Sequence, residues 1–226
     1  ESLTLEKKLR EIARRDEEIS LEEEIRKKLT VSGYIFRDHR VKPEKDEFPE
    51  LDEDALALIE DVWYNGTALD EKFGERITRR DLMTLRNLDW LNDEVIDTYL
   101  SLICERSKNA SGLPKVYAFT TFFYTNLAQH GYGKVKRWTR KVDIFTFDIL
   151  LVPVHLGAHW CLAVIDFQNS RIEYYDSMGG NNNRCLTLLR NYLNEESIDK
   201  RKKPFSVDNW KFYCRQDIPQ QMNGSD

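Results

Sequence analysis

The spacing of apolar residues along the chain changes near residue 148. Before this point, apolar residues recur at three- and four-residue intervals, which is typical of helices that bury one face. After it, three short apolar or β-rich runs, 148–154, 160–166 and 171–175, are separated by turn residues. We predict that they form neighbouring strands, buried on both faces or nearly so. With a helix predicted over 183–193 and a further strand over 207–213, the order of elements indicates an α+β domain.

The helices expected before residue 148 have recognisable boundaries. One is predicted over 52–64 and another over 120–129. Thr78 and Asp81 have the spacing of a capping box before a short helix. Asn92 is expected to cap a further helix. The apolar residues which that helix is expected to bury are Val95, Ile96, Tyr99, Leu100 and Ile103.

The first part of the chain differs in composition from the rest. Residues 1–30 are interpreted as a charged helical extension, because a thin apolar stripe runs among Glu, Lys and Arg. A solvated helix that joins the domain to something else, a short coiled coil and a partner-binding helix are all compatible with this pattern. Residues 31–47 are predicted to be a linker, and residues 48–226 the domain itself.

Composition limits the functions that we expect. The 226 residues are 41% hydrophobic and carry a net charge of −5, which argues against nucleic-acid binding as the main role. No apolar run approaches the roughly 20 residues of a membrane span, so we expect no membrane partner. The four cysteines are scattered without a C-x-x-C pair, which predicts buried free thiols in the cytosol or nucleus. The basic run 200–203 is a weak nuclear-import candidate and is otherwise a solvated loop.

A histidine and an aspartate stand at the ends of two predicted strands. His159 precedes the run 160–166, and Asp176 follows the run 171–175. If these strands form a hairpin around Asn169-Ser170, their far ends meet and Asp176 lies beside His159. The carboxylate would then accept a hydrogen bond from one imidazole nitrogen, fixing the tautomer and stabilising the imidazolium.

Gln221 follows in the order typical of a thiol protease, where it would donate a side-chain amide hydrogen to the developing oxyanion. The nucleophile of such a site is expected at the position directly after Asp226, at the start of a helix that lowers its thiol pKa. Because the chain also starts at Glu1 rather than Met, we interpret it as a fragment cut at both ends, with a C-terminally truncated domain.

Simpler interpretations of these residues also exist. His159 alone could be a hydrogen-bonded core histidine. His155 and His159 could suggest a metal pair, but Pro153 and Gly157 prevent the two from sharing a helix face, so no metal is predicted. Cys161 could be mistaken for a nucleophile, yet its apolar surroundings predict a buried strand residue. No cofactor is predicted.

Six sequence strings strongly resemble the sentrin/SUMO-specific branch of the ubiquitin-like-protein protease family. The resemblance covers about 48–226 and the strings occur in the same order. They are 90–94 (WLNDE), 122–124 (FFY), 135–139 (VKRWT), 159–166 (HWCLAVID), 174–179 (YYDSMG) and 220–226 (QQMNGSD).

The resemblance implies the fold and the catalytic residues. It implies a papain-like cysteine protease fold of the ubiquitin-like protease type, with a small central sheet flanked by helices and its C-terminal part missing from this sequence. His159 and Asp176 match the catalytic pair of the family, and Gln221 matches its oxyanion glutamine. The cysteine of the family lies beyond the end of the sequence.

The resemblance also implies substrate-binding residues. Trp90 and Trp160 match two tryptophans that roof a tunnel for the Gly-Gly tail of the modifier, a passage that suits glycine because it has no Cβ. Asp93 matches an acidic residue that pairs with an arginine on SUMO. His155 is expected in a loop near the cleft. Trp90 could instead cap a core, and Asp93 could simply be a favourable charge in the first turn of a helix.

From this resemblance we expect a SUMO-specific cysteine endopeptidase and isopeptidase. It would mature SUMO precursors and remove SUMO from lysines of target proteins, as a monomer in the nucleus and also in the cytoplasm. One alternative is a protease for another ubiquitin-like modifier such as NEDD8. Another is a pseudo-protease that binds SUMO without cleaving it, which the residue after Asp226 would decide.

Overall fold

The computed structural model describes five stretches of the chain, residues 50–64, 68–74, 76–86, 89–222 and 224. The predicted charged helix and the predicted linker lie outside these residues, as do the first two residues of the predicted domain. The second of two compact units runs from Glu53 to Asp226. Within the described part of the chain, no helix has the length and apolar character needed to cross a membrane.

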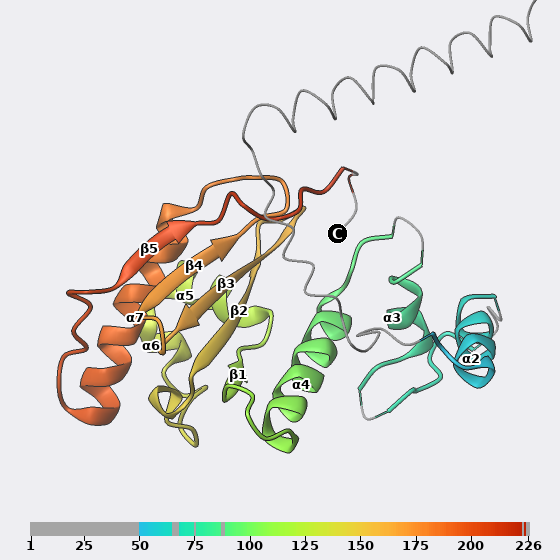
Figure 1. The fold of residues 1–226 in the computed structure, drawn as a ribbon, viewed down its shortest axis with the longest axis horizontal. Helices are drawn as coiled ribbons and strands as arrows, with labels where there is room; N and C mark the ends of the chain where they lie inside the picture. The colour runs from blue at the N-terminus through green and yellow to red at the C-terminus, as the bar shows by residue number, and fades with distance from the viewer. Residues whose placement is uncertain (1–49, 65–67, 75, 87–88, 223, 225–226) are drawn as a thin grey trace, which may run out of the picture. The chain divides into compact units, whose positions relative to one another are not determined.

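A five-stranded sheet forms the centre of this unit, with its strands side by side in chain order (Figure 1). The first and last pairs of strands are parallel, and the two pairs between them are antiparallel. The three strands predicted after residue 148 are confirmed to within one residue at each end. The strands are β1 (Val116–Ala118), β2 (Ile149–His155), β3 (Trp160–Asp166), β4 (Arg171–Tyr175) and β5 (Lys211–Cys214).

The two outer strands differ from expectation. The sequence does not predict β1, because its three residues pair with β2 more than thirty positions later in the chain. The last strand, predicted over 207–213, begins at Lys211 instead. The Trp210 N–H donates to the Val207 carbonyl at 2.9 Å, which closes a turn before the strand can start.

Three of the helices contact the sheet. α5 contacts β2, α7 contacts β4 and β5, and apolar side chains of both helices share one core with the sheet. α4 contacts β1 (Figure 1). This central sheet with separate helices confirms the predicted α+β class. The helical elements are α2 (Glu53–Tyr64), α3 (Arg79–Met83), α4 (Asp93–Asn109), α5 (Phe122–His130), α6 (Tyr132–Val135), the 3₁₀ turn η1 (Ile144–Thr146) and α7 (Asn183–Arg201).

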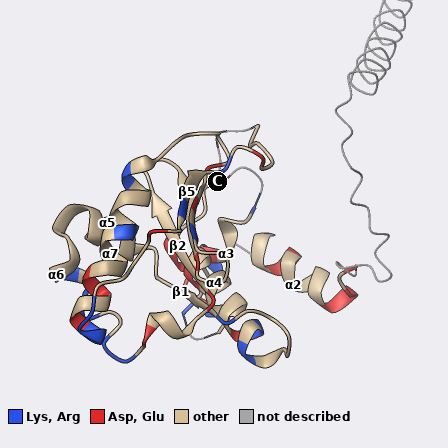
Figure 2. Cartoon of the chain, turned by 60° about the vertical axis from the view of Figure 1, so that its left-hand side comes forward, with Lys and Arg blue, Asp and Glu red and all other residues tan. Residues whose placement is uncertain are grey.

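The acidic helix α2 is tied to α3 by charge. The charged residues of α2 are all Asp or Glu, and the helix contains neither Lys nor Arg (Figure 2). Arg79 of α3 is buried and donates to the Asp61 carboxylate at 2.7 Å and to the Glu71 carboxylate. A buried guanidinium is stable only with such partners, so these ion pairs hold the two short helices together.

Both predicted helix caps are present. The Thr78 side chain and the Asp81 side chain each bond the other residue's backbone N–H, which forms the predicted capping box. Asn92 accepts a hydrogen bond from the Val95 N–H at 3.0 Å at the start of α4. The prediction that α4 buries Tyr99 is wrong, since this side chain is 65% exposed. α4 contacts the sheet at the edge strand β1. The face of α4 that is buried is therefore narrower than its apolar pattern indicates.

Helix α7 extends eight residues beyond the predicted end at 193. Polar residues suggest an end there, but Glu196 continues the buried face. Its carboxylate accepts hydrogen bonds from the Tyr132 hydroxyl at 2.7 Å and the Thr139 hydroxyl at 2.5 Å. These donors come from distant parts of the chain and satisfy a charge that would otherwise be costly to bury.

Candidate active site

The loop between β2 and β3 places His159 at one end of the sheet. His155 pairs with Trp160 across the hairpin, and the Leu156 N–H donates to the His159 carbonyl at 2.9 Å. Gly157 has φ +94°, a left-handed conformation that favours glycine. The prediction that His155 lies in the loop is wrong, because it ends β2 and its ring lies 4.3 Å from that of Trp160.

The register of the next hairpin brings Asp176 to the same end of the sheet. Leu162 pairs with Tyr175, so Asp176 follows β4 where β3 begins. The turn between the strands contains Asn169 and Ser170, as predicted, and the Asp166 carboxylate accepts hydrogen bonds from the Asn169 N–H and side chain at 3.0 and 2.7 Å. The hairpin expected from the sequence is therefore confirmed.

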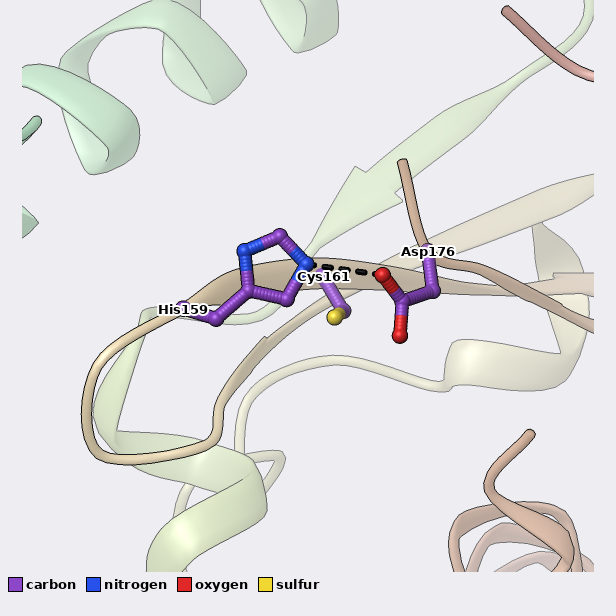
Figure 3. Close-up of side chains that lie close together, drawn as sticks. All are labelled: His159, Cys161 and Asp176. Carbon is purple, nitrogen blue, oxygen red and sulfur yellow. Dashed lines mark hydrogen bonds and ion pairs between the residues drawn. The ribbon is translucent and has the colours of Figure 1, made fainter. Parts of the chain in front are cut away.

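His159 and Asp176 form a hydrogen-bonded pair. Nε2 of His159 lies 2.7 Å from Oδ1 of Asp176, and the two side chains are only 12% and 7% exposed. The other ring nitrogen, Nδ1, points away from the carboxylate (Figure 3). Their predicted contact is thus present in the structure, and their catalytic role stays a prediction.

Two backbone N–H groups also act on the Asp176 carboxylate. Burial raises the pKa of Asp176, but hydrogen bonds from His159 and from the Met178 and Gly180 N–H groups outweigh it and leave the pKa below its ordinary value. The Met178 bond measures 2.8 Å. Asp176 is therefore ionised at neutral pH and suited to stabilising a protonated imidazole.

Gly180 is a residue whose importance the sequence analysis missed. A Cβ at this position would lie 2.3 Å from Oδ2 of Asp176, closer than real Cβ atoms approach any group. Only glycine therefore lets the backbone N–H come near the carboxylate. The position of Gly179-Gly180 just after Asp176 is the signal that could have revealed this contact.

Gln221 lies beside the residue that follows Asp176. Its backbone N–H donates to the Ser177 carbonyl at 2.8 Å, and its Oε1 accepts from the Ser177 hydroxyl at 2.8 Å. Upstream, Arg215 ties the same segment to β4 through a 2.7 Å ion pair with Glu173. The structure thus gathers His159, Asp176 and Gln221 at one end of the sheet, and adds Ser177, which the sequence analysis did not single out.

The predicted tunnel residues come from segments that touch each other. The Trp160 indole N–H donates to the Leu91 carbonyl at 2.9 Å, next to Trp90 in the chain. Trp90 is 53% exposed, so it does not cap a core. Asp93 is the first residue of α4, directly after the capping Asn92. The start of α4 therefore lies at the strand that follows His159, while the binding roles of Trp90, Trp160 and Asp93 stay predictions.

One group of potential metal ligands is found among the described residues. Donor atoms of His159, Cys161 and Asp176 all lie within 4.8 Å of one another (Figure 3). Their types would suit zinc. However, the His159 and Asp176 donors already bond each other, and Cys161 is a buried strand residue, as predicted. His155 does not belong to this group. The geometry favours a hydrogen-bonded pair next to a core thiol.

A large cavity lies elsewhere. A cavity of about 720 Å³ is lined by residues of α4 and β1, among them Asp97, Cys104 and Tyr117. His159, Asp176 and Gln221 are not among its lining residues. The candidate site is therefore identified by its chemistry at the end of the sheet and not by this cavity.

Comparison with known sequences gives one consistent result. Residues 89–226 match the Ulp1 protease family, C-terminal catalytic domain. A sentrin-specific protease of Caenorhabditis elegans is 49% identical over 207 residues, which is 90% of this chain and 30% of that protein. Human sentrin-specific protease 2 is 42% identical over 186 residues, 80% of this chain and 31% of that protein. The chain thus spans about a third of the length of these relatives.

Comparison with solved structures agrees. The C-terminal Ulp1 protease domain in complex with Smt3, the yeast ortholog of SUMO, is 32% identical with a TM-score of 0.66, and the match covers 80% of each chain. The catalytic domain of the Chaetomium thermophilum Ulp1-like SUMO protease is 27% identical with a TM-score of 0.65, over 80% of this chain and 76% of the other. These similarities confirm the predicted papain-like cysteine protease fold of the Ulp1 type.

Proposed function

This chain belongs to the Ulp1 protease family, and from that premise we propose that it is the catalytic part of a SUMO-specific cysteine protease. It matures SUMO precursors and releases SUMO from lysines of target proteins by hydrolysis after the C-terminal Gly-Gly. The observation that carries this proposal is the 2.7 Å contact between His159 and Asp176, with Gln221 held at the same end of the sheet. The similarity to a Ulp1 domain in complex with Smt3 supports SUMO as the partner.

The geometry suggests how each group acts. His159 takes the proton of the nucleophilic thiol of a cysteine protease through the ring nitrogen that points away from Asp176. The thiolate attacks the glycine carbonyl, and the Gln221 amide donates to the oxyanion. His159 gives its proton to the leaving amine as the carbon–nitrogen bond breaks, which leaves a thioester. Water, deprotonated by His159, then hydrolyses the thioester and restores the thiol.

Asp176 has a supporting role in this mechanism. It accepts from Nε2 of His159, so that Nδ1 is the nitrogen that would meet the thiol. Its ionised state stabilises the imidazolium that forms when the thiol loses its proton. The N–H groups of Met178 and Gly180 keep the carboxylate in place, so the imidazole meets a fixed acceptor.

Substrate selection is proposed to depend on Trp90, Trp160 and Asp93. The bond from Trp160 to Leu91 holds one indole next to the segment that carries the other. A narrow passage between indoles would admit the Gly-Gly tail and reject residues with a Cβ. Asp93, at the start of α4, would pair with an arginine on the folded part of SUMO.

A panel of modifiers tests the proposed function. The full-length protein is incubated with SUMO precursor, a SUMO–lysine conjugate, NEDD8 precursor and ubiquitin precursor, and products are followed over time. We expect cleavage of the two SUMO substrates at least about 100-fold faster than the others. Faster NEDD8 cleavage would replace SUMO by NEDD8, and SUMO binding without any cleavage would indicate a pseudo-protease.

We also propose that the protein acts in the nucleus. The four cysteines, all among the described residues, are not joined in disulfides, which suits a reducing compartment such as the nucleus or the cytosol. The basic run 200–203 is a weaker argument for nuclear import, because two of its residues, at the end of α7, already have partners. Lys200 donates to the Lys136 carbonyl, and Arg201 donates to the Asp143 carboxylate. Imaging of the full-length tagged protein in cells tests this, and exclusion from nuclei would contradict it.

A further inference from the structure

Ser177 links the two halves of the candidate site. It directly follows Asp176, whose carboxylate contacts His159. Its carbonyl accepts from the Gln221 N–H, and its hydroxyl donates to Gln221 Oε1, both at 2.8 Å. One dipeptide, Asp176-Ser177, therefore contacts both the proposed base and the proposed oxyanion donor.

The hydroxyl contact determines which way the amide of Gln221 is turned. A glutamine side chain has an oxygen that accepts and a nitrogen that donates, and these two ends have nearly the same shape. Only the nitrogen can stabilise an oxyanion. With Oε1 bound to the Ser177 hydroxyl, Nε2 is turned to the opposite side of the amide group.

The turn that carries Ser177 is well fixed. The Gly179 N–H donates to the Asp176 carbonyl at 2.9 Å, and Gly179 adopts φ +73°. A Cβ at Gly179 would lie 3.1 Å from Oε1 of Gln220, so this turn packs closely against the segment that carries Gln221. Because the turn is fixed, Ser177 can hold the segment that carries Gln221 in a defined position, although that segment has no regular secondary structure.

We propose that Ser177 is a positioning residue for Gln221 in the hydrolysis of SUMO substrates. Its hydroxyl holds the Gln221 amide with the nitrogen toward the oxyanion, without itself touching substrate. This inference rests on the proposed function. Because Asp176 and Ser177 are adjacent, the same turn orients the imidazole and the oxyanion donor, and the two groups keep a constant spacing.

The test uses full-length protein and SUMO precursor, with Ser177→Thr and Ser177→Val as a matched pair of nearly equal shape. Thr retains the hydroxyl and Val replaces it by a methyl group. Because loss of an oxyanion donor itself costs about 10²- to 10³-fold in kcat, we expect the Val variant to lose about 10-fold in kcat relative to the Thr variant. KM should change less than about two-fold, since substrate binding is not affected.

A second comparison separates positioning from general structural damage. In a Gln221→Ala background, the Thr and Val variants should have the same kcat, because there is no amide left to orient. Equal kcat of the two variants with Gln221 present would overturn the proposal, as would a 10-fold difference that persists without Gln221. Failure of the unmutated protein to cleave SUMO would instead reject the proposed function, so the two failures are distinguishable.

Discussion

The two halves of the candidate site are held in place by different means. His159 and Asp176 stand at strand ends, and the antiparallel register of β2, β3 and β4 brings them to 2.7 Å. Gln221 lies beyond the last strand, in a segment without regular secondary structure that is attached through Ser177 and, further upstream, through Arg215. The first half depends on many ladder hydrogen bonds, and the second on a few backbone and side-chain contacts.

This difference determines which substitutions should disturb the site. A single substitution hardly changes a sheet register, because every ladder bond of the strand would have to shift with it. Removing one hydroxyl or adding one methyl group can displace a segment that a few contacts hold. We therefore expect the groups held by the sheet to lose their catalytic function only when they are themselves removed. Around the turn 176–180, a small displacement of the supporting contacts should already lower activity.

The largest effect is expected when the base is deleted from the sheet. His159→Ala in the full-length protein should lower kcat on SUMO precursor by about 10³-fold or more, because proton transfer to and from the thiol is lost. SUMO binding, measured by calorimetry, should persist. His130→Ala, at an exposed position on α5, is the matched control and should keep full activity. Substantial turnover by the His159 variant would remove this residue from the mechanism.

A smaller effect is expected from an added methyl group at the turn. Gly180→Ala would place Cβ 2.3 Å from Oδ2 of Asp176, so the carboxylate or the turn must move. We expect kcat to fall about 10-fold and the free energy of unfolding to fall by about 1–3 kcal/mol. In Gly133→Ala, the control, the new Cβ has no neighbour within 4 Å. Wild-type kinetics of the Gly180 variant would show that the carboxylate is not confined as described.

The smallest effect concerns the charge of Asp176. Because its pKa is lowered in the folded state, it stabilises the fold above the ordinary pKa of about 3.9. This contribution is lost as the pH falls through the folded-state pKa. The parent should therefore exceed Asp176→Asn in free energy of unfolding by about 1 kcal/mol at pH 6, and this difference should shrink below pH 4. Chemical denaturation at several pH values measures it, and a constant difference would contradict the cause assigned to the shift.

The sequence allows the sheet half of the site to be predicted. Three apolar runs, a turn at Asn169-Ser170 and the alternation of strand residues are local signals, and they suffice to place Asp176 beside His159. The similarity to known proteases was needed to single out Trp90 and Asp93 as substrate-binding residues, since an isolated tryptophan or a first-turn aspartate carries no pattern of its own.

Contacts between distant segments could not be predicted from local patterns. Ser177 is important through its contact with Gln221, and Gly180 through its contact with Asp176. Nothing in the turn itself reveals the contact between Ser177 and Gln221. The length of α7 was underestimated for the same reason, because Glu196 is buried only with donors from another part of the chain. A three-residue strand such as β1 likewise depends on its remote partner.

The most direct test of the account is a double-mutant cycle on cleavage of SUMO precursor by the full-length protein. The four proteins are the parent, His159→Ala, Asp176→Asn and the double variant. Because Asp176 is held to act only through His159, the double variant should be about as slow as His159→Ala alone. If the two losses in kcat instead multiply, Asp176 acts independently of His159, and the hydrogen-bonded pair at the end of the sheet is not the catalytic unit proposed here.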